Sequence, residues 1–179
     1  MKPLFTVHAG EFLVACKIER KFRHVNIWVP AKDTGIDLLI TNSKNTKRVS
    51  LQVKFSRAYV SDKGLRTGFW TLTRQKIKDS KADFWVFVLV EAVSGSHDFI
   101  IISPDDLLKR LGCLHSKGAT LRTYFCMTPA TRGRKSKCYE TRGLKEQHLR
   151  AIAEGRFEDD ARDFTKYLGI WEPMKALNH

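Results

Sequence analysis

The sequence has few acidic residues, few cysteines and no long apolar run. No apolar stretch approaches the about 18 to 20 residues that a membrane-spanning helix needs. The first eight residues are too short and too little apolar for a secretory signal, so we expect a cytoplasmic protein with no membrane partner. Only 19 acidic residues stand against 32 lysines and arginines, which gives a formal net charge of +13. This excess favours a polyanionic partner, and DNA or another nucleic acid is the leading candidate.

The four cysteines, Cys16, Cys113, Cys126 and Cys138, are widely spaced and include no C-x-x-C pair. A zinc site formed by His115 with the last three cysteines is conceivable, but it lacks the closely spaced ligand pairs of such sites. Free thiols in a reducing compartment are the favoured interpretation.

The apolar pattern predicts an α/β chain built around one core, because 179 residues hardly suffice for two independent domains. Strands are expected over 25–29, 36–40, 48–56, 84–90, 99–102 and 121–127, and the run 84–90 is apolar on both faces, as in a buried central strand. Helices are expected over 8–22, from Thr71 or Thr73 to Lys78, over 104–112 after a Ser103 cap, and over 158–168, with Trp171 packing back on the core. In the first helix, Glu11, Ala15, Ile18 and Phe22 share one face.

Basic residues concentrate after Gly112, with nine basic and two acidic residues from Cys113 to Arg150. Residues 128–143 are expected to form a long mobile basic loop that contacts phosphates, with a merely solvated surface as the alternative. A second basic loop is expected over 57–68. The predicted nucleic-acid-binding residues are Arg57, Lys63, Arg66, Arg132, Arg134, Lys135 and Lys137. The chain thus divides into a core, 1–112, and a basic loop and helical extension, 113–179, packed on it within one structural domain.

Three polar side chains interrupt the apolar strands. Asp37 lies within 36–40, and Gln52 and Lys54 are two apart on the alternating strand 48–56, so they share a face. A hairpin joining these strands would bring Asp37 beside Gln52 and Lys54, and Glu11 could reach the same place from the first helix. Burying a carboxylate and an ammonium group is costly unless they are paired or used.

This set of side chains suits phosphodiester hydrolysis. Mg²⁺ or Mn²⁺ prefers oxygen ligands, which Asp37 and Glu11 supply as carboxylates, Gln52 as an amide and Val53 as a backbone carbonyl. Such an ion polarises the phosphate and generates hydroxide near neutral pH. Lys54 would position the water or offset the charge that develops on the phosphate.

These segments resemble the PD-(D/E)XK nuclease superfamily, which includes restriction endonucleases and archaeal Holliday-junction resolvases. The resemblance covers about residues 10–111 and rests on Gly10-Glu11, on 35–40 (GIDLLI) and on 51–54 (LQVK). It implies a restriction-endonuclease-like mixed β-sheet flanked by helices, with a basic C-terminal extension, and Mg²⁺-dependent endonuclease activity on DNA.

The resemblance also implies individual roles. Asp37 matches the metal-binding aspartate of the family, Lys54 its strand lysine and Glu11 its helix glutamate. Ile36 stands where the family has proline. Gln52 stands where it usually has Asp or Glu, which removes one charge from the metal site.

Plainer explanations stay open for each residue. Asp37 could be a turn-proximal carboxylate bonded to backbone amides, Lys54 a side chain that reaches solvent from an edge strand, and Glu11 a partner of the helix N-terminus. Two other functions also stay open: a protein of the same fold that binds DNA or RNA without catalysis, and an assembly protein on ribosomal RNA. The nuclease interpretation allows a homodimer, because dimers are common where both strands must be cut.

Overall fold

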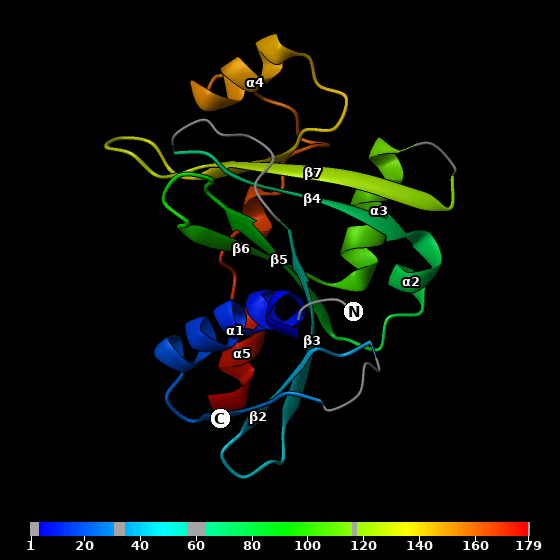
Figure 1. Cartoon of the computed structure of the whole chain (residues 1–179), viewed down its shortest axis with the longest axis vertical. Helices are drawn as coiled ribbons and strands as arrows, with labels where there is room; N and C mark the ends of the chain where they lie inside the picture. The colour runs from blue at the N-terminus through cyan, green and yellow to red at the C-terminus, as the bar shows by residue number, and fades with distance from the viewer. Residues whose placement is uncertain (1–3, 31–34, 57–63, 116–117, 179) are drawn as a thin grey trace.

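The computed structural model describes residues 4–30, 35–56, 64–115 and 118–178 (Figure 1). Its elements are, in chain order, α1 (Leu4–Lys21), β1 (Val25–Trp28), β2 (Leu38–Asn42), β3 (Arg48–Phe55), β4 (Arg66–Thr73), α2 (Arg74–Lys78), β5 (Phe84–Val90), β6 (His97–Ile102), α3 (Pro104–Leu114), β7 (Thr120–Thr128), β8 (Lys137–Glu140), α4 (Glu146–Ala153), η1 (Thr165–Tyr167), α5 (Glu172–Lys175) and η2 (Ala176–Asn178).

The strands of the described residues form one mixed, eight-stranded sheet in the order β1-β2-β3-β5-β4-β7-β8, with β6 also paired to β5. β1, β2 and β3 are antiparallel, whereas β3 and β5 are parallel. β4 meets β5 in register only at Thr67 and Val90, yet it pairs with β7 along its whole length. The sheet therefore has two parts, β1-β2-β3-β5-β6 and β4-β7-β8, which meet near the end of β5.

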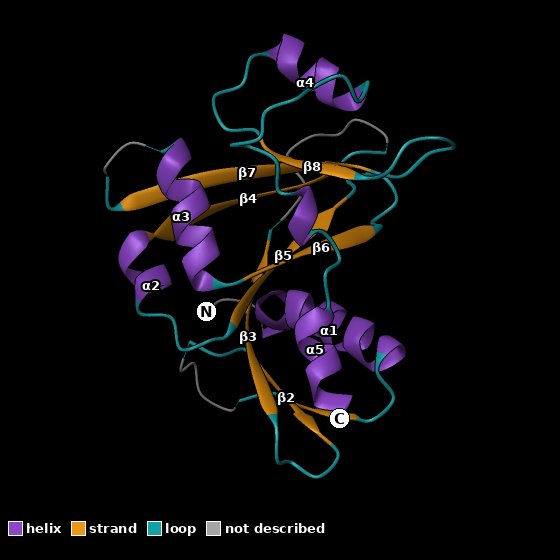
Figure 2. Ribbon diagram, turned by 180° about the vertical axis from the view of Figure 1, so that it is seen from behind, coloured by secondary structure: helices purple, strands orange, loops and turns teal. Residues whose placement is uncertain are grey.

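β5 supplies side chains to two separate cores because it is apolar on both faces. Trp85, Phe87 and Leu89 pack against β4, β7, α2 and α3, while Val86 and Val88 pack against α1 and the C-terminal segment. Figure 2 shows α2 and α3 on one side of β3 and β5, and α1 with α5 on the other. The prediction of a buried central strand over 84–90 is confirmed, since its five inner residues are all buried.

Several local signals behave as the sequence predicts. Ser103 caps α3 by accepting a hydrogen bond from the Asp106 N–H at 3.2 Å, and Pro104 opens the helix. Thr73 caps α2 through the Lys76 N–H. Trp171 is almost completely buried in the core beside α1, where it meets Phe99 edge to face.

Other expectations were wrong where a distant strand or core decides the conformation. The loop expected over 57–68 overlaps β4, which pairs with β7 and makes Thr71 a strand residue instead of a helix cap. Residues 128–143 form a hairpin with strand β8 instead of a long loop. The helix expected over 158–168 is absent apart from η1, and α4 lies earlier, while α3 continues past Gly112.

The buried face of α1 also differs from the expected one. Val14, Ile18 and Phe22 are buried, and Gly10 lies one turn before Val14, against β3. A Cβ atom on Gly10 would lie only 2.4 Å from the Cβ of Phe55, so glycine allows the helix to approach the strand closely. Glu11 therefore lies beside the contact face of the helix. None of the helices in the described ranges has the length and apolar character of a membrane span.

Candidate functional site

The register of the β2–β3 hairpin gathers the predicted polar residues on one face. Leu38 pairs with Leu51, and both are fully buried on the side of α1. Because side chains alternate along a strand, Gln52 and Lys54 point to the opposite face. Asp37 directly precedes β2, whose pairing with β3 ends at Leu38 and Leu51, and its N–H donates to the Leu51 carbonyl at 2.8 Å. Asp37 thereby lies opposite Gln52.

Hydrogen bonds fix the Asp37 carboxylate. Gln52 Nε2 donates to Asp37 Oδ2, and the Val53 N–H donates to the same oxygen at 2.7 Å. Since the N–H and C=O of one residue in an extended strand point to the same edge, the Val53 carbonyl faces the Asp37 side of β3 as well. Three of the four predicted metal ligands, Asp37, Gln52 and Val53, are thus brought together.

Lys54 lies over an aromatic ring that β5 supplies. Its Nζ atom is 5.1 Å from the ring centroid of Trp85, within cation–π range. The parallel β3–β5 register pairs Gln52 with Trp85, and Trp85 Nε1 donates to Ser80 Oγ at 2.9 Å. The ring is therefore anchored beside Gln52 and Lys54.

Gln52, Lys54 and Trp85 line a pocket of about 530 Å³ between β3, β4 and α2. Its other ionisable wall residues are Lys76, Asp79 and Lys81. Asp79 accepts a hydrogen bond from Gln75 at 2.6 Å, so three cations surround one occupied carboxylate. We call this hollow the lysine pocket.

The sequence alone did not indicate a role at this site for three of the lining residues, Trp85, Lys76 and Lys81. The basic segment 74–81 (RQKIKDSK) gave a signal for the two lysines, but Trp85 looked like an ordinary core residue. Its role beside Lys54 follows only from the strand register.

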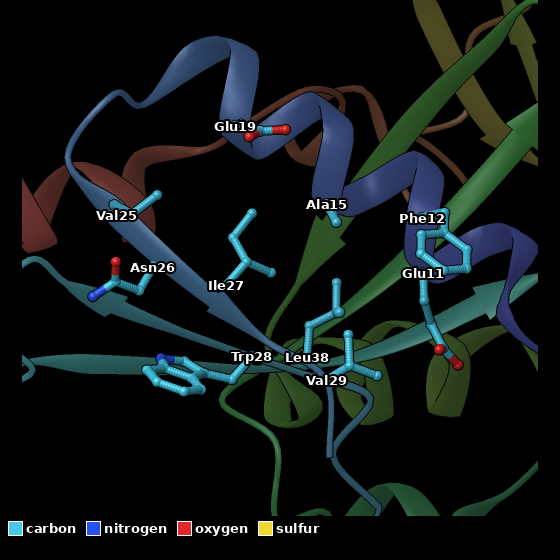
Figure 3. A pocket seen from close by; sticks show the side chains of 10 residues that line it. All are labelled: Glu11, Phe12, Ala15, Glu19, Val25, Asn26, Ile27, Trp28, Val29 and Leu38. Carbon is cyan, nitrogen blue, oxygen red and sulfur yellow. The ribbon is translucent and has the colours of Figure 1, made fainter. Parts of the chain in front are cut away.

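Glu11 lies at a different hollow. It lines a groove of about 760 Å³ between α1 and β1, together with the exposed side chains of Phe12, Trp28 and Val29. In Figure 3 its carboxylate lies at the margin of this groove, apart from Glu19 at the other end. Glu11 does not line the lysine pocket.

Within the described ranges, no three His, Cys, Asp or Glu side chains gather closely enough to hold a metal ion. The zinc alternative is therefore wrong: Cys138 belongs to the core of β5 and β7, Cys126 to the cluster beneath α4, and Cys113 is exposed. Asp79 is the acidic residue in the lining of the lysine pocket, and it already accepts from Gln75. The oxygen donors gathered around Asp37 are its own carboxylate and the amide and carbonyl oxygens of Gln52 and Val53. Mg²⁺ in proteins is often held by only one or two carboxylates together with substrate phosphates, so this oxygen-donor set fits a hard cation.

The predicted nucleic-acid-binding residues are dispersed. Arg57 and Lys63 lie outside the described residues, and Arg66 forms an ion pair with Asp98 at 3.4 Å. The others lie on the β7–β8 hairpin, where Arg132, Arg134 and Lys135 are exposed and Lys137 is half-buried. A hydrogen bond with Tyr139 raises the pKa of Lys137.

This hairpin and the lysine pocket lie at opposite ends of the β4–β7 ladder. The ladder runs from Arg66 and Met127, beside the hairpin, to Thr73 and Thr120, beside α2. At about 3.3 Å per residue this separates the two ends by roughly 23 Å.

No family model, curated protein or solved structure matches this chain.

The site combines a held carboxylate with a held cation. Two donors, Gln52 and the Val53 N–H, fix the Asp37 carboxylate. Lys54, two residues after Gln52 on β3, lies over the Trp85 ring. An arrangement of this kind can bind a hard cation and a phosphate group side by side.

Proposed function

We propose that this protein is a Mg²⁺-dependent endonuclease that hydrolyses DNA phosphodiester bonds at Asp37, Gln52 and Lys54. The observation that carries the proposal is the bonding of Asp37 to Gln52 and the Val53 N–H, with Lys54 on the same strand face above Trp85. The proposal includes a restriction-endonuclease-like fold with residues 113–179 as a basic extension, and a cytoplasmic location.

Asp37, Gln52 and the Val53 carbonyl would hold the cation. When bound, Mg²⁺ or Mn²⁺ supplies Lewis-acid polarisation of the phosphate and lowers the pKa of a bound water. Gln52 turns its amide nitrogen toward Asp37, so a rotation of the amide group offers its oxygen to a cation instead.

Lys54 serves the phosphate. A fixed ammonium group beside the scissile phosphate stabilises charge that grows in the transition state, and it needs little reorganisation if it is already positioned. Trp85 restricts the position of Lys54 through a contact typically worth about 0.5 to 1 kcal/mol. Lys76 and Lys81 on the pocket wall would hold the neighbouring phosphates.

A second candidate function is nucleic-acid binding without catalysis. It is favoured because the predicted metal ligands that lie together include one carboxylate, Asp37, whose Oδ2 already accepts two hydrogen bonds. In that case Asp37 and Gln52 would only join β2 to β3.

Nicking of supercoiled plasmid by purified protein, with Mg²⁺, Mn²⁺ or EDTA, separates these candidates. We expect cutting with either metal and none with EDTA. Lys54→Ala and Asp37→Asn should each abolish cutting while DNA affinity changes by less than about threefold, because one charge among many is altered. Lys78→Ala is the matched control, since it removes an exposed lysine from α2 that does not line the pocket, and it should leave cutting intact.

The outcomes are distinct. Metal-dependent cutting that survives both Lys54→Ala and Asp37→Asn would place the activity elsewhere. DNA binding with no cutting under any metal would favour the binding function. Glu11→Gln tests the remaining predicted ligand: unchanged cutting would remove Glu11 from the site.

A further inference from the structure

Two hollows adjoin one another on the side of the molecule away from the lysine pocket. One, of about 620 Å³, lies between α1 and the start of β6, and the other, of about 540 Å³, lies between β6 and the β7–β8 hairpin. They share Asp98 and Gly169 as lining residues, so they are adjacent, and we refer to the two together as the depression. Figures 1 and 2 agree that the hairpin and the C-terminal half of α1 lie on one side of the molecule, with α2 on the other.

The charges along this depression are strongly one-sided. Its basic residues are Lys17, Arg20 and Lys21 from α1, Arg66 from β4 and Lys135 from the hairpin. Asp98 is the acidic residue in the lining of either hollow, and it already pairs with Arg66 at 3.4 Å. The other four cations form no ion pair within 4 Å with a described carboxylate, although Lys17 lies near Asp98 and Lys21 near Glu172. We call these four residues, Lys17, Arg20, Lys21 and Lys135, the cationic track.

The three α1 members of the track are held close together by the helix. Lys17, Arg20 and Lys21 are spaced i, i+3 and i+4, so they lie on one helix face and repel one another. All three are exposed, which keeps them hydrated and accessible. A polyanion lying along this face would relieve the repulsion and release its own counterions.

The lining also indicates how such a polyanion is recognised. Among its aromatic residues, Phe99 and Trp171 are 2% exposed each, and they pack on each other inside the core. The exposed aromatic residues Phe12, Trp28 and Phe69 do not line either hollow. Among the described lining residues, only the half-buried His97 ring, which packs edge to face on Phe99, is open to stacking by an unpaired base. The track therefore suits the regular phosphate backbone of a duplex better than single-stranded DNA.

We propose that the cationic track is a second DNA-contact site, which binds the backbone of double-stranded DNA independently of sequence and apart from the Asp37 site. The choice of DNA as the polyanion rests on the proposed function, whereas binding by the track requires no catalysis. Because the track and the lysine pocket lie on opposite sides, they would contact different parts of a long or branched DNA.

The test measures binding alone, by fluorescence anisotropy of a labelled duplex in EDTA over a range of salt concentrations. The triple variant Lys17→Gln/Arg20→Gln/Lys21→Gln is compared with Lys44→Gln/Lys78→Gln/Lys109→Gln, which removes the same charge from exposed positions outside both hollows and the lysine pocket. Loss of three phosphate contacts should reduce the slope of log affinity against log salt by about 2 to 3 and weaken binding at least roughly tenfold at low salt. The control should reduce the slope by less than about 1.

Equal losses in the two triple variants would overturn the proposal, since net charge alone would then explain binding. Tighter binding of single-stranded DNA than of a duplex of equal length would overturn the choice of duplex. Circular dichroism and thermal melting check that both variants fold. If the α1 variant does not, the single variants Lys17→Gln and Arg20→Gln should each lower the slope by about 0.9, and no change in either would refute the track.

The outcome is independent of the nuclease proposal. Plasmid nicking by the wild type can fail while the track is supported, which would leave a DNA-binding protein without catalysis. Conversely, nicking can succeed while the two triple variants bind alike, which would remove the track and leave the Asp37 site standing.

Discussion

Replacing Gln52 with glutamate tests the Asp37 site most directly, because it changes a hydrogen-bond donor into a second carboxylate. In the wild type, Gln52 Nε2 donates to Asp37 Oδ2, and the Val53 N–H donates to the same atom at 2.7 Å. Gln52→Glu loses the first of these donors and places two negative charges side by side.

The cost can be worked from this geometry. Two like charges about 4 Å apart repel by about 4 kcal/mol at an effective dielectric constant of about 20. Both side chains are half-buried, so solvent screening reduces this to about 1 to 2 kcal/mol, and the lost hydrogen bond adds about 1 kcal/mol. At roughly 2 to 4 °C per kcal/mol, the melting temperature of Gln52→Glu in EDTA should fall by roughly 5 to 10 °C.

Mg²⁺ should reverse the loss. A divalent ion between the two carboxylates stabilises the folded state by about 2.7 kcal/mol when its concentration is about 100 times the dissociation constant. The wild type, with one carboxylate, should gain less. In the plasmid assay, Gln52→Glu should cut at least as well as the wild type, and it should restore some cutting if the wild type is inactive.

The assay is thermal unfolding followed by circular dichroism, in EDTA and in millimolar Mg²⁺. Gln147→Glu is the matched control, because it makes the same chemical change at an exposed position of α4. If Gln52→Glu melts like the wild type in EDTA, and Mg²⁺ raises its melting temperature no more than that of Gln147→Glu, the reasoning about the Asp37 site is refuted.

Two further predictions concern the scaffold. Gly10→Ala should destabilise the protein by about 1 to 3 kcal/mol in urea denaturation, because the new Cβ atom would meet the Phe55 Cβ at 2.4 Å. Gly112→Ala in α3 should be neutral or stabilising, because the nearest atom to its new Cβ is the Arg74 guanidinium at 3.4 Å, an ordinary van der Waals distance. Equal effects of the two changes would contradict the close contact of α1 with β3. Burial, reinforced by nearby cations such as Arg142, lowers the pKa of His115 below its usual 6.5. The unfolded chain therefore binds this proton more readily, so the contribution of His115 to stability is complete above about pH 6.5 and is lost as the pH falls through the lowered pKa. His115→Gln should flatten the decline of stability below pH 6.5, and an unchanged profile would show that His115 is not responsible.

Much of the local structure follows from the sequence. The alternation in β3 places Gln52 and Lys54 on one face, and the apolar run of β5 makes it a central strand, because both patterns depend on residues a few positions apart. The Ser103 cap of α3 is local for the same reason. The juxtaposition of Asp37 and Gln52 also follows, since a short hairpin leaves few alternative registers.

The rest depends on contacts between distant segments. Residues 66–68, at the start of β4, look like the end of a basic loop until β7 supplies their hydrogen-bonding partner. The β7–β8 hairpin replaces an expected loop in the same way. Close packing at Gly10 sets the rotation of α1 and moves Glu11 to a separate groove, although its helical spacing suggested a place beside Asp37. Trp85 lies beneath Lys54 only because β3 pairs in parallel with β5. Likewise, α1 and the β7–β8 hairpin come to line adjacent hollows, which share Asp98 and Gly169, only in the folded chain. Sequence periodicity specifies which face of an element is apolar, but which element covers that face is decided by tertiary packing over the whole chain.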